Sequence, residues 1–416
     1  MTIKKIYTLW AVAALALGSC VSDHGQTIPL EPDSTPGGDI APIDGIPSDA
    51  LAGFTNPPSV SKPTVPMPDV AWRVVDGPMG VKIAEFVMPG LRYPSSEEWM
   101  NYLTGTGGEA AVKQGVWVSV DGDAKGCKVV NNYNGEVTKP IDVDMVLLVN
   151  NSNNMGEAGD KFYFGLEDFA TKIAGNNISA RYGCVGYGGG ESVKGVDGAC
   201  SLTDVASLKA YLGREGCSGV TRTKGFADAD ELEHLAQSRF QNCDGECGVE
   251  ALKYADEAFT FRANAYRMYL NVTDEPNQPG GDAQWSVEAV KSQEQWPAGS
   301  GTIHTLYSGY KMTENEANSF EFPWLLSDYT GGFTTYTDSK LTDVTLQTLP
   351  VVESMRRFVV IRIAKVEKYM DGKAHDVKIT VQSFDEKIKT EKTYKVVFGS
   401  LYDLSGGSMS KNNARV

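Results

Sequence analysis

The chain has 416 residues, with 38 basic and 53 acidic side chains and a formal net charge of −15 at pH 7. So acidic a surface, without any block of Lys or Arg, repels phosphate backbones and argues against nucleic-acid binding. The four histidines lie far apart, which excludes the HExxH metalloproteases, and the length allows two to three domains.

The N-terminus has the pattern of an export signal. Lys4 and Lys5 precede the apolar stretch Ile6–Leu17, which is too short to span a bilayer. The following residues, Leu17 to Cys20, resemble the lipobox of bacterial lipoproteins. We therefore expect residues 1–19 to be a signal peptide and Cys20 to carry the lipid, although an ordinary signal peptide with an incidental Cys is the alternative. The implied location is the bacterial cell envelope, in the outer membrane, with membrane contact through the lipid anchor only.

Residues 20–68 are predicted to be the lipid anchor and a disordered tether. Residues 21–68 hold ten of the nineteen prolines, and their charged side chains are acidic except Lys62. Such a segment cannot bury enough apolar surface to fold on its own.

Two β-rich segments, 69–140 and 355–400, flank the centre of the chain. Alternating apolar residues predict strands at 70–75, 80–88, 115–120, 357–363, 375–382 and 392–398. A helix is expected at 95–103, with Ser95 or Ser96 as its cap. Each flank alone has too few strands for an independent core, so we expect the two flanks to form one β-sandwich module. Two separate modules, or a C-terminal hairpin packed on the central domain, remain alternatives, and residues 401–416 are expected to be a flexible tail.

Between the flanks, residues 141–354 alternate strands and helices. Asp142–Val149 is a nearly continuous apolar run, which is typical of a buried parallel strand. Further strands are expected at 178–187, 266–273, 302–308 and 332–336. Helices are expected at 157–174, 202–213, 228–239, 248–262, 284–295, 313–327 and 340–354. This alternation predicts an α/β domain with a doubly wound, mostly parallel sheet, whose ligands bind beyond the carboxyl ends of the strands.

Six cysteines remain after the one assigned to the lipid. An even number outside the cytoplasm predicts disulfides, with these candidates: Cys127, Cys184, Cys200, Cys217, Cys243 and Cys247. The pair Cys243–Cys247 closes the shortest loop. A zinc site is disfavoured because no CxxC pair occurs.

Polar residues gather where strands of the central segment are expected to end. The first strand runs into Asn150-Asn-Ser-Asn-Asn-Met-Gly156, and a later strand runs into Thr273-Asp-Glu275. Between them lies Cys243-Asp-Gly-Glu-Cys-Gly248, and Thr330-Gly-Gly332 follows near the end. In order and spacing, residues 141–354 resemble the von Willebrand factor A (VWA) family. Its members hold a divalent cation at a metal-ion-dependent adhesion site, with Asp-x-Ser-x-Ser, a Thr and a later Asp as ligands.

The match to that site is partial. Asn150 stands in place of the first Asp, and Asn154 in place of the second Ser. Ser152 and Asp274 match, whereas Glu246 lies near the position of the Thr, where no hydroxyl residue occurs. The resemblance implies Asn150, Ser152, Asn154, Glu246 and Asp274 as ligands of Ca²⁺ or Mg²⁺, weakened because the first carboxylate is lost. The alternative is a polar turn in which Ser152 or Asn154 caps the next helix.

The resemblance implies a binding or adhesion protein that presents a VWA-like domain to a protein or extracellular-matrix ligand. No constellation of catalytic residues competes with this reading, so the chain is not expected to be an enzyme. A structural subunit of an envelope assembly or surface fibre is the alternative. A hydrolase that uses Asp274 or Glu275 is a weaker one, since no His or Lys partner is evident nearby.

Overall fold

The computed structural model describes residues 56–77, 80–94, 96–102, 115–189, 195–213, 225–227, 230–243, 245–291, 296–309, 321–322 and 324–399. The predicted signal peptide, Cys20, Cys217 and the 401–416 tail lie outside these residues. Across the described ranges, no helix combines the length and apolar character that crossing a membrane requires.

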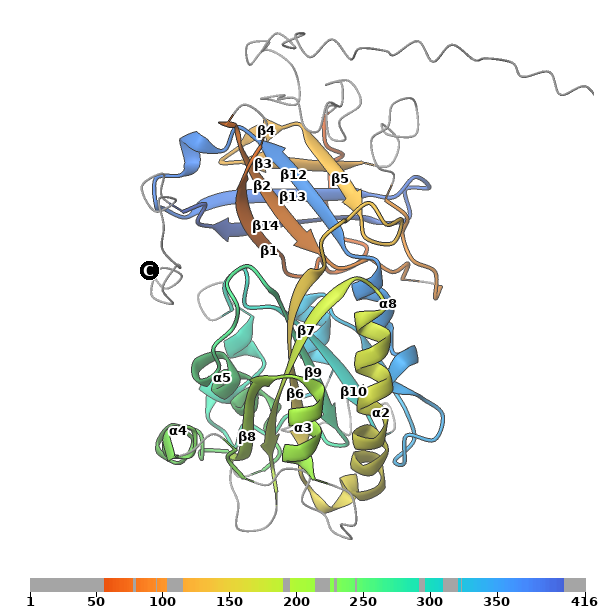
Figure 1. The fold of residues 1–416 in the computed structure, drawn as a ribbon, viewed down its shortest axis with the longest axis vertical. Coiled ribbons are helices and arrows are strands. Elements are labelled where there is room, and N and C mark those ends of the chain that lie inside the picture. The colour runs from red at the N-terminus through yellow and green to blue at the C-terminus, as the bar shows by residue number, and fades with distance from the viewer. Residues whose placement is uncertain are drawn as a thin grey trace, which may run out of the picture.

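A β-sandwich forms one end of the molecule (Figure 1). Its first sheet has the order β1 (Ala71–Asp76), β2 (Lys82–Met88), β12 (Val359–Ala364) and β5 (Cys127–Asn131). The second has the order β14 (Lys389–Val396), β13 (His375–Gln382), β3 (Val116–Val120) and β4 (Asp123–Lys125). All neighbours are antiparallel, and each sheet joins strands from both flanks: β12 pairs with β2 and β5, and β13 pairs with β3.

Alternating apolar residues explain this sandwich. Val377, Ile379 and Val381 of β13 point inward and are fully buried, as are Phe86 of β2 and Ile361 of β12. Successive strand residues face opposite sides of a sheet, so the period-two pattern selects one face for the core.

The helix expected in the first flank is wrong, and the tether ends earlier than expected. Residues 96–102 are not helical; Trp99 forms a bridge with Arg92, and Met100 and Tyr102 enter the core. Buried side chains two residues apart suit an extended chain, because a helix would turn them to different faces. The last residues assigned to the tether also pack on the sandwich, since the Thr64 amide donates to Lys389 O (2.9 Å) and Met67 is buried.

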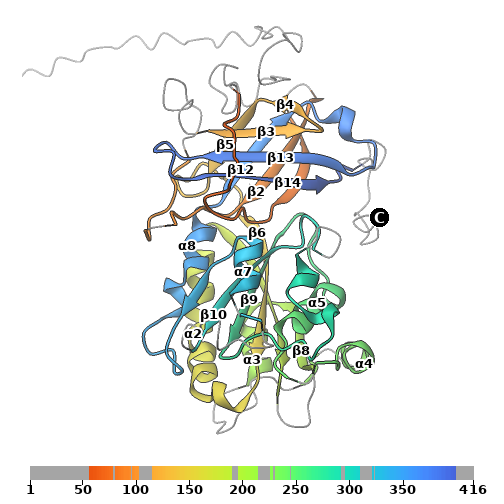
Figure 2. The same ribbon diagram turned by 180° about the vertical axis from the view of Figure 1, so that it is seen from behind.

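The central segment forms a mixed α/β domain with a six-stranded, mostly parallel sheet. The sheet order is β11 (Thr334–Tyr336), β10 (Thr302–Tyr307), β9 (Tyr266–Thr273), β6 (Ile141–Asn150), β7 (Ile178–Tyr187) and β8 (Val196–Thr203), and only β8 is antiparallel. One face packs on α2 (Gly156–Ala174), α3 (Val205–Leu212) and α8 (Pro350–Arg356). The other packs on α4 (Asp230–Arg239), α5 (Gly248–Ala258) and α7 (Leu325–Thr330) (Figures 1 and 2).

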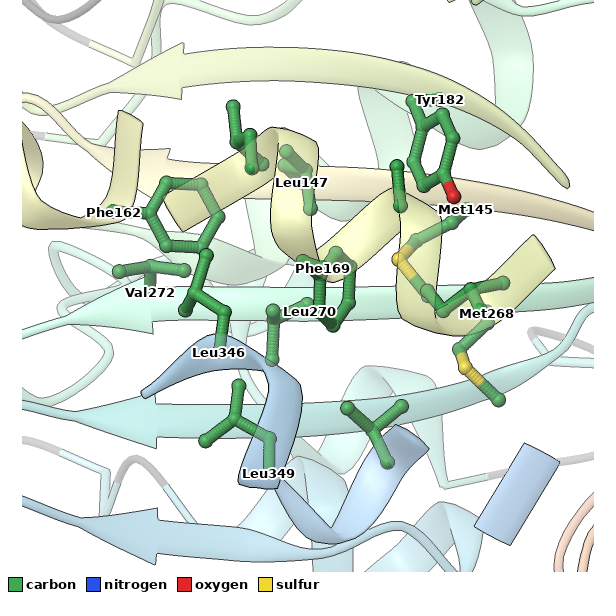
Figure 3. Close-up of a cluster of buried hydrophobic side chains, with 14 of the residues drawn as sticks. Met145, Leu147, Phe162, Phe169, Tyr182, Met268, Leu270, Val272, Leu346 and Leu349 are labelled. Carbon is green, nitrogen blue, oxygen red and sulfur yellow. The ribbon is translucent and has the colours of Figure 1, made fainter. Parts of the chain in front are cut away.

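The strand β6 is apolar on both faces because helices cover both. Leu147 faces α2, where Phe162 and Phe169 lie on the helix side turned to the sheet (Figure 3). Val146 and Leu148 belong to the cluster on the α5 side. The described residues also form short 3-10 helices: η3 (Asn153–Met155), η4 (Ala283–Trp285), η5 (Glu288–Val290), η6 (Leu346–Thr348) and η7 (Glu367–Tyr369).

Some expected elements differ from those observed. The strand β8 was not predicted, because its sequence Val-Asp-Gly-Ala-Cys-Ser-Leu-Thr lacks a clear alternation. The helix expected from residue 202 begins instead at Val205, where the side chain of Asp204 accepts from Ser207 N (2.8 Å). As far as Lys291, the short turns η4 and η5 take the place of the helix expected at 284–295, because Ser286 between them is extended.

The sandwich lies against the amino ends of the parallel strands. Before β7, the Asn176 carbonyl accepts from Asn132 Nδ2 (2.8 Å). Before β10, the Gly301 amide donates to the Asp69 carboxylate (2.6 Å), and Tyr266 at the start of β9 donates to Asp69 O (3.2 Å). The carboxyl ends of these strands therefore lie at the pole of the molecule opposite the sandwich (Figure 2).

Candidate functional site

At that opposite pole, two neighbouring strands end in polar residues. The strands β6 and β9 are parallel with Val149 opposite Val272, so Asn150 lies beside Thr273 and Asp274. The loop before α5 adds Glu246. The structure thus brings together four of the five predicted site residues: Asn150, Ser152, Glu246 and Asp274.

The Asn150 side chain is at the centre of this cluster and is fully buried. Its Nδ2 donates to Glu246 Oε2 (2.7 Å), Asp274 Oδ1 (3.0 Å) and Thr273 Oγ1 (3.2 Å). Its Oδ1 accepts from the Ser152 amide (2.8 Å). Because a backbone N–H can only donate, this last bond fixes which end of the amide faces the carboxylates.

Ser152 and Asn154 have different positions. The Ser152 side chain is buried and acts to lower the pKa of Glu246, whereas Asn154 lies in η3 and is exposed. The structure therefore does not place Asn154 with the other four. The capping alternative is also wrong, since neither η3 nor α2 has a side-chain hydrogen bond at its N-cap, and the α2 cap is Met155.

Glu246 is positioned by close backbone packing. Its carbonyl accepts from Gln278 N (3.1 Å), which ties its loop to the chain after β9. Gly188, just after β7, has φ +71°, and a Cβ there would lie 2.8 Å from Glu246 Cγ. A side chain at 188 would therefore be strained and would displace Glu246.

The cluster carries excess negative charge. The pKa of Glu246 is raised to about 7, mainly by burial and then by the charge of Asp274, and the hydrogen bond from Asn150 opposes the shift. Burial, followed by Asp274, also raises the pKa of Glu275. Two neighbouring carboxylates with raised pKa values in one polar cluster are typical of a functional site.

A small pocket opens beside the cluster. Its lining includes Tyr187, Glu246, Asn271, Glu275, Pro276 and Phe322. The Tyr187 hydroxyl donates to Asn271 Oδ1 (2.7 Å), which fixes the pocket wall, and Phe322 stacks on Trp324 with ring centroids 4.5 Å apart.

Sequence reasoning missed Thr273, Tyr187 and Asn271 as site residues. Tyr187 and Thr273 are the last residues of β7 and β9. Strands β6, β7 and β9 are parallel neighbours whose ends share one edge, and this was the signal that could have found them.

The residues do not fit a divalent cation in this arrangement. A hard cation needs converging oxygen atoms, but Asn150 presents its N–H groups to the carboxylates and commits its oxygen to Ser152. Among the described residues, no group of three or more His, Cys, Asp or Glu side chains has a metal-binding arrangement.

The predicted disulfides are not present between the cysteines that the structure describes. These five are buried free thiols: Cys127, Cys184, Cys200, Cys243 and Cys247. Cys184 on β7 and Cys200 on β8 are direct cross-strand partners. The neighbouring Cys247 thiol is the largest cause of the raised pKa of Cys243, which places the two thiols close together.

No family model matches the chain, and no curated protein matches it. A solved structure that does match is that of proximal thread matrix protein 1 from the mussel byssus, with a zinc-occupied MIDAS motif; it is 12% identical, with a TM-score of 0.34, and the match covers 54% of this chain and 48% of that chain. The chain thus spans about half the length of that protein.

Proposed function

We propose that this protein is a binding module whose ligand-contacting face is the carboxyl edge of the parallel sheet. The observation that carries the proposal is the convergence of Asn150, Glu246 and Asp274, from three separate chain segments, beside a pocket. In open α/β sheets, ligands bind outside the carboxyl ends of the strands. A group with hydrogen-bond donors or positive charge complements the carboxylates, and Phe322 offers an apolar contact.

The proposal includes a domain of VWA type. The sequence motifs at the strand ends support it, and the order of the six strands, 3-2-1-4-5-6 in chain order, is that of a doubly wound α/β sheet. No cation forms part of the proposal, because Asn150 faces the carboxylates with its amide nitrogen.

We further propose display on a bacterial cell envelope, toward a protein or matrix ligand. The lipobox-like Leu17–Cys20 supports an anchor. The chain runs from there to the sandwich, and the proposed ligand face lies at the opposite pole, directed away from the anchored end.

Binding is favoured over hydrolysis because the site has no described histidine. His304 lies in the middle of β10, where burial lowers its pKa to about 3 and its Nδ1 accepts from Phe333 N (3.1 Å). His375 lies in the sandwich, and His234 lies on α4. Acid–base catalysis at Asp274 or Glu275 would lack these partners.

The test is ligand binding by matched variants. The full chain is passed over immobilised matrix proteins, with collagen and fibronectin as first probes and protease shaving of intact cells to establish surface display. Glu246→Gln and Asp274→Asn are expected to weaken binding roughly tenfold or more, because each removes a charged acceptor. The control Glu231→Gln removes an exposed charge on α4. Absence of wild-type binding to matrix proteins, or equal binding by all variants, would contradict the proposal.

A further inference from the structure

We infer that the Asn150 amide nitrogen takes the place of a bound cation, so that the site is assembled without any metal. This inference concerns how the site is held together, and it stands whether or not the proposed ligand face is correct.

The geometry supports this replacement. Asn150 Nδ2 has two hydrogens and lies within 3.2 Å of three acceptors that come from two other segments of the chain. It joins the ends of β6 and β9 to the loop before α5, which is the bridging role that a cation performs between oxygen ligands. The amide oxygen is held by Ser152 N at 2.8 Å, so rotation of the amide toward a metal would leave a buried N–H without its acceptor.

The charges around Asn150 also support this replacement. An amide supplies partial positive charge without desolvating an ion, and Asn150 is fully buried between Glu246 and Asp274. Replacing it with Asp would set a third carboxylate against these two and remove both donated hydrogens. The variant would then need a cation to restore the contacts.

The experiment compares full-length wild type with Asn150→Asp by calorimetry and thermal unfolding, using Mg²⁺ and Mn²⁺ alone as probes. Without metal, Asn150→Asp is expected to unfold roughly 5 °C below wild type. At about 10 mM Mg²⁺ the variant is expected to recover most of this loss, whereas the melting temperature of wild type is expected to change by less than about 1 °C. Ionic strength is matched with NaCl to separate binding from screening.

Asn132→Asp is the matched control. It places the same charge on another buried amide, but at the sandwich end, where Asn132 Nδ2 faces the carbonyls of Asn176 and Arg356. It is expected to be destabilised and not rescued by Mg²⁺. Saturable Mg²⁺ or Mn²⁺ binding by wild type that Asp274→Asn abolishes would overturn the inference. So would an Asn150→Asp variant that remains as stable as wild type without metal, or one that binds no metal.

Discussion

At the scale of single residues, two pairs of buried thiols are placed for oxidation. Cys184 and Cys200 are directly opposed on antiparallel strands and belong to one buried cluster. Opposed residues in such strands have Cα atoms roughly 4.5–5.5 Å apart, inside the range that a disulfide spans. The charge of Cys200 contributes, after burial, to raising the pKa of Cys184, which reflects their proximity.

We therefore predict Cys184–Cys200 and Cys243–Cys247 crosslinks when the protein is exposed to a disulfide oxidant such as oxidised glutathione. Each crosslink releases two protons and passes two electrons to the oxidant, which becomes two thiols. Peptide mapping without reduction checks this, with Cys127→Ser as a control that should leave both crosslinks intact. A map in which Cys184 pairs with Cys217, or stays a thiol, would contradict the first crosslink.

His375 gives the sandwich a pH-dependent contact. Its Nδ1 lies 2.7 Å from Asp121 Oδ2 and its Nε2 lies 3.0 Å from Asp371 Oδ1, with the ring of Tyr369 packed against it. Burial lowers its pKa, but the hydrogen bonds to Asp121 and Asp371 raise it more, and the net shift is upward. The hydrogen bond to His375 lowers the pKa of Asp121, and the Lys373 amide followed by His375 lowers that of Asp371.

The sign of the effect follows from linkage. Because folding raises the pKa of His375, its stabilising contribution is complete below the unfolded value of about 6.5 and is lost as pH rises through the folded pKa. The two carboxylates lose their contribution only in more acidic solution, below about pH 4. We predict that the melting-temperature difference between wild type and His375→Gln is larger near pH 5.5 than near pH 8.5. A difference that does not change over this interval would be inconsistent with the paired, charged His375.

At the scale of elements, one buried carboxylate joins β6, β7 and the turn before β9. The Asp144 side chain is fully buried and accepts from Arg181 (2.7 and 3.0 Å), from Arg262 Nε (2.8 Å) and from Arg262 N (2.6 Å). Removing one partner of a buried ion pair leaves the other charges uncompensated.

We predict that Asp144→Ala lowers the free energy of unfolding by about 3 kcal/mol, at the lower end for buried pairs because both arginines can partly rehydrate. Asp142→Ala is the control, since Asp142 contacts the same Arg262 (2.8 Å) with half of its side chain exposed, and should cost less than about 1 kcal/mol. Denaturant unfolding of both variants measures the difference. Similar losses of unfolding free energy in the two variants would show that the burial of Asp144 does not determine its contribution to stability.

The elements also show where sequence reasoning succeeds and fails. The apolar run at Asp142–Val149 predicted a central buried strand, and the mostly parallel α/β sheet is confirmed. The residues of β8 gave no such signal, because an edge strand with Gly198 needs little apolar pattern. For the site, the predicted ends of two strands were enough to locate Asn150 and Asp274. The direction in which the Asn150 amide points depends on its contact with Ser152 N, which no spacing reveals.

At the scale of the whole molecule, the sandwich and the α/β domain are connected because the α/β domain is inserted between two strands of the sandwich. The α/β domain lies between β5 and β12, which are neighbours in one sheet, so its entry and exit strands are paired. Asp69 extends this connection, because its carboxylate accepts from Gly301 (2.6 Å) at the start of β10. Burial of Asp69 between the bodies raises its pKa, and the nearby charge of Lys392 opposes that shift. The site at the far pole is thus carried by a domain whose support, the sandwich, is built from both flanks.

This arrangement predicts that the N-terminal flank cannot fold without the C-terminal one. The strand β12 lies between β2 and β5, and β13 lies between β14 and β3, so a chain that ends at residue 356 loses an interior strand from each sheet. The apolar side chains of β2 and β3 would then lack their partners in the core, and two isolated hairpins are marginal in water. Hydrogen exchange measured by mass spectrometry is expected to show loss of protection throughout 71–88 and 116–131. A chain that ends at residue 399 keeps every described strand and serves as the control. If the shorter chain kept native protection in β2 and β3, the N-terminal flank would fold on its own, and the pairing of β12 with β2 would contribute little to its stability.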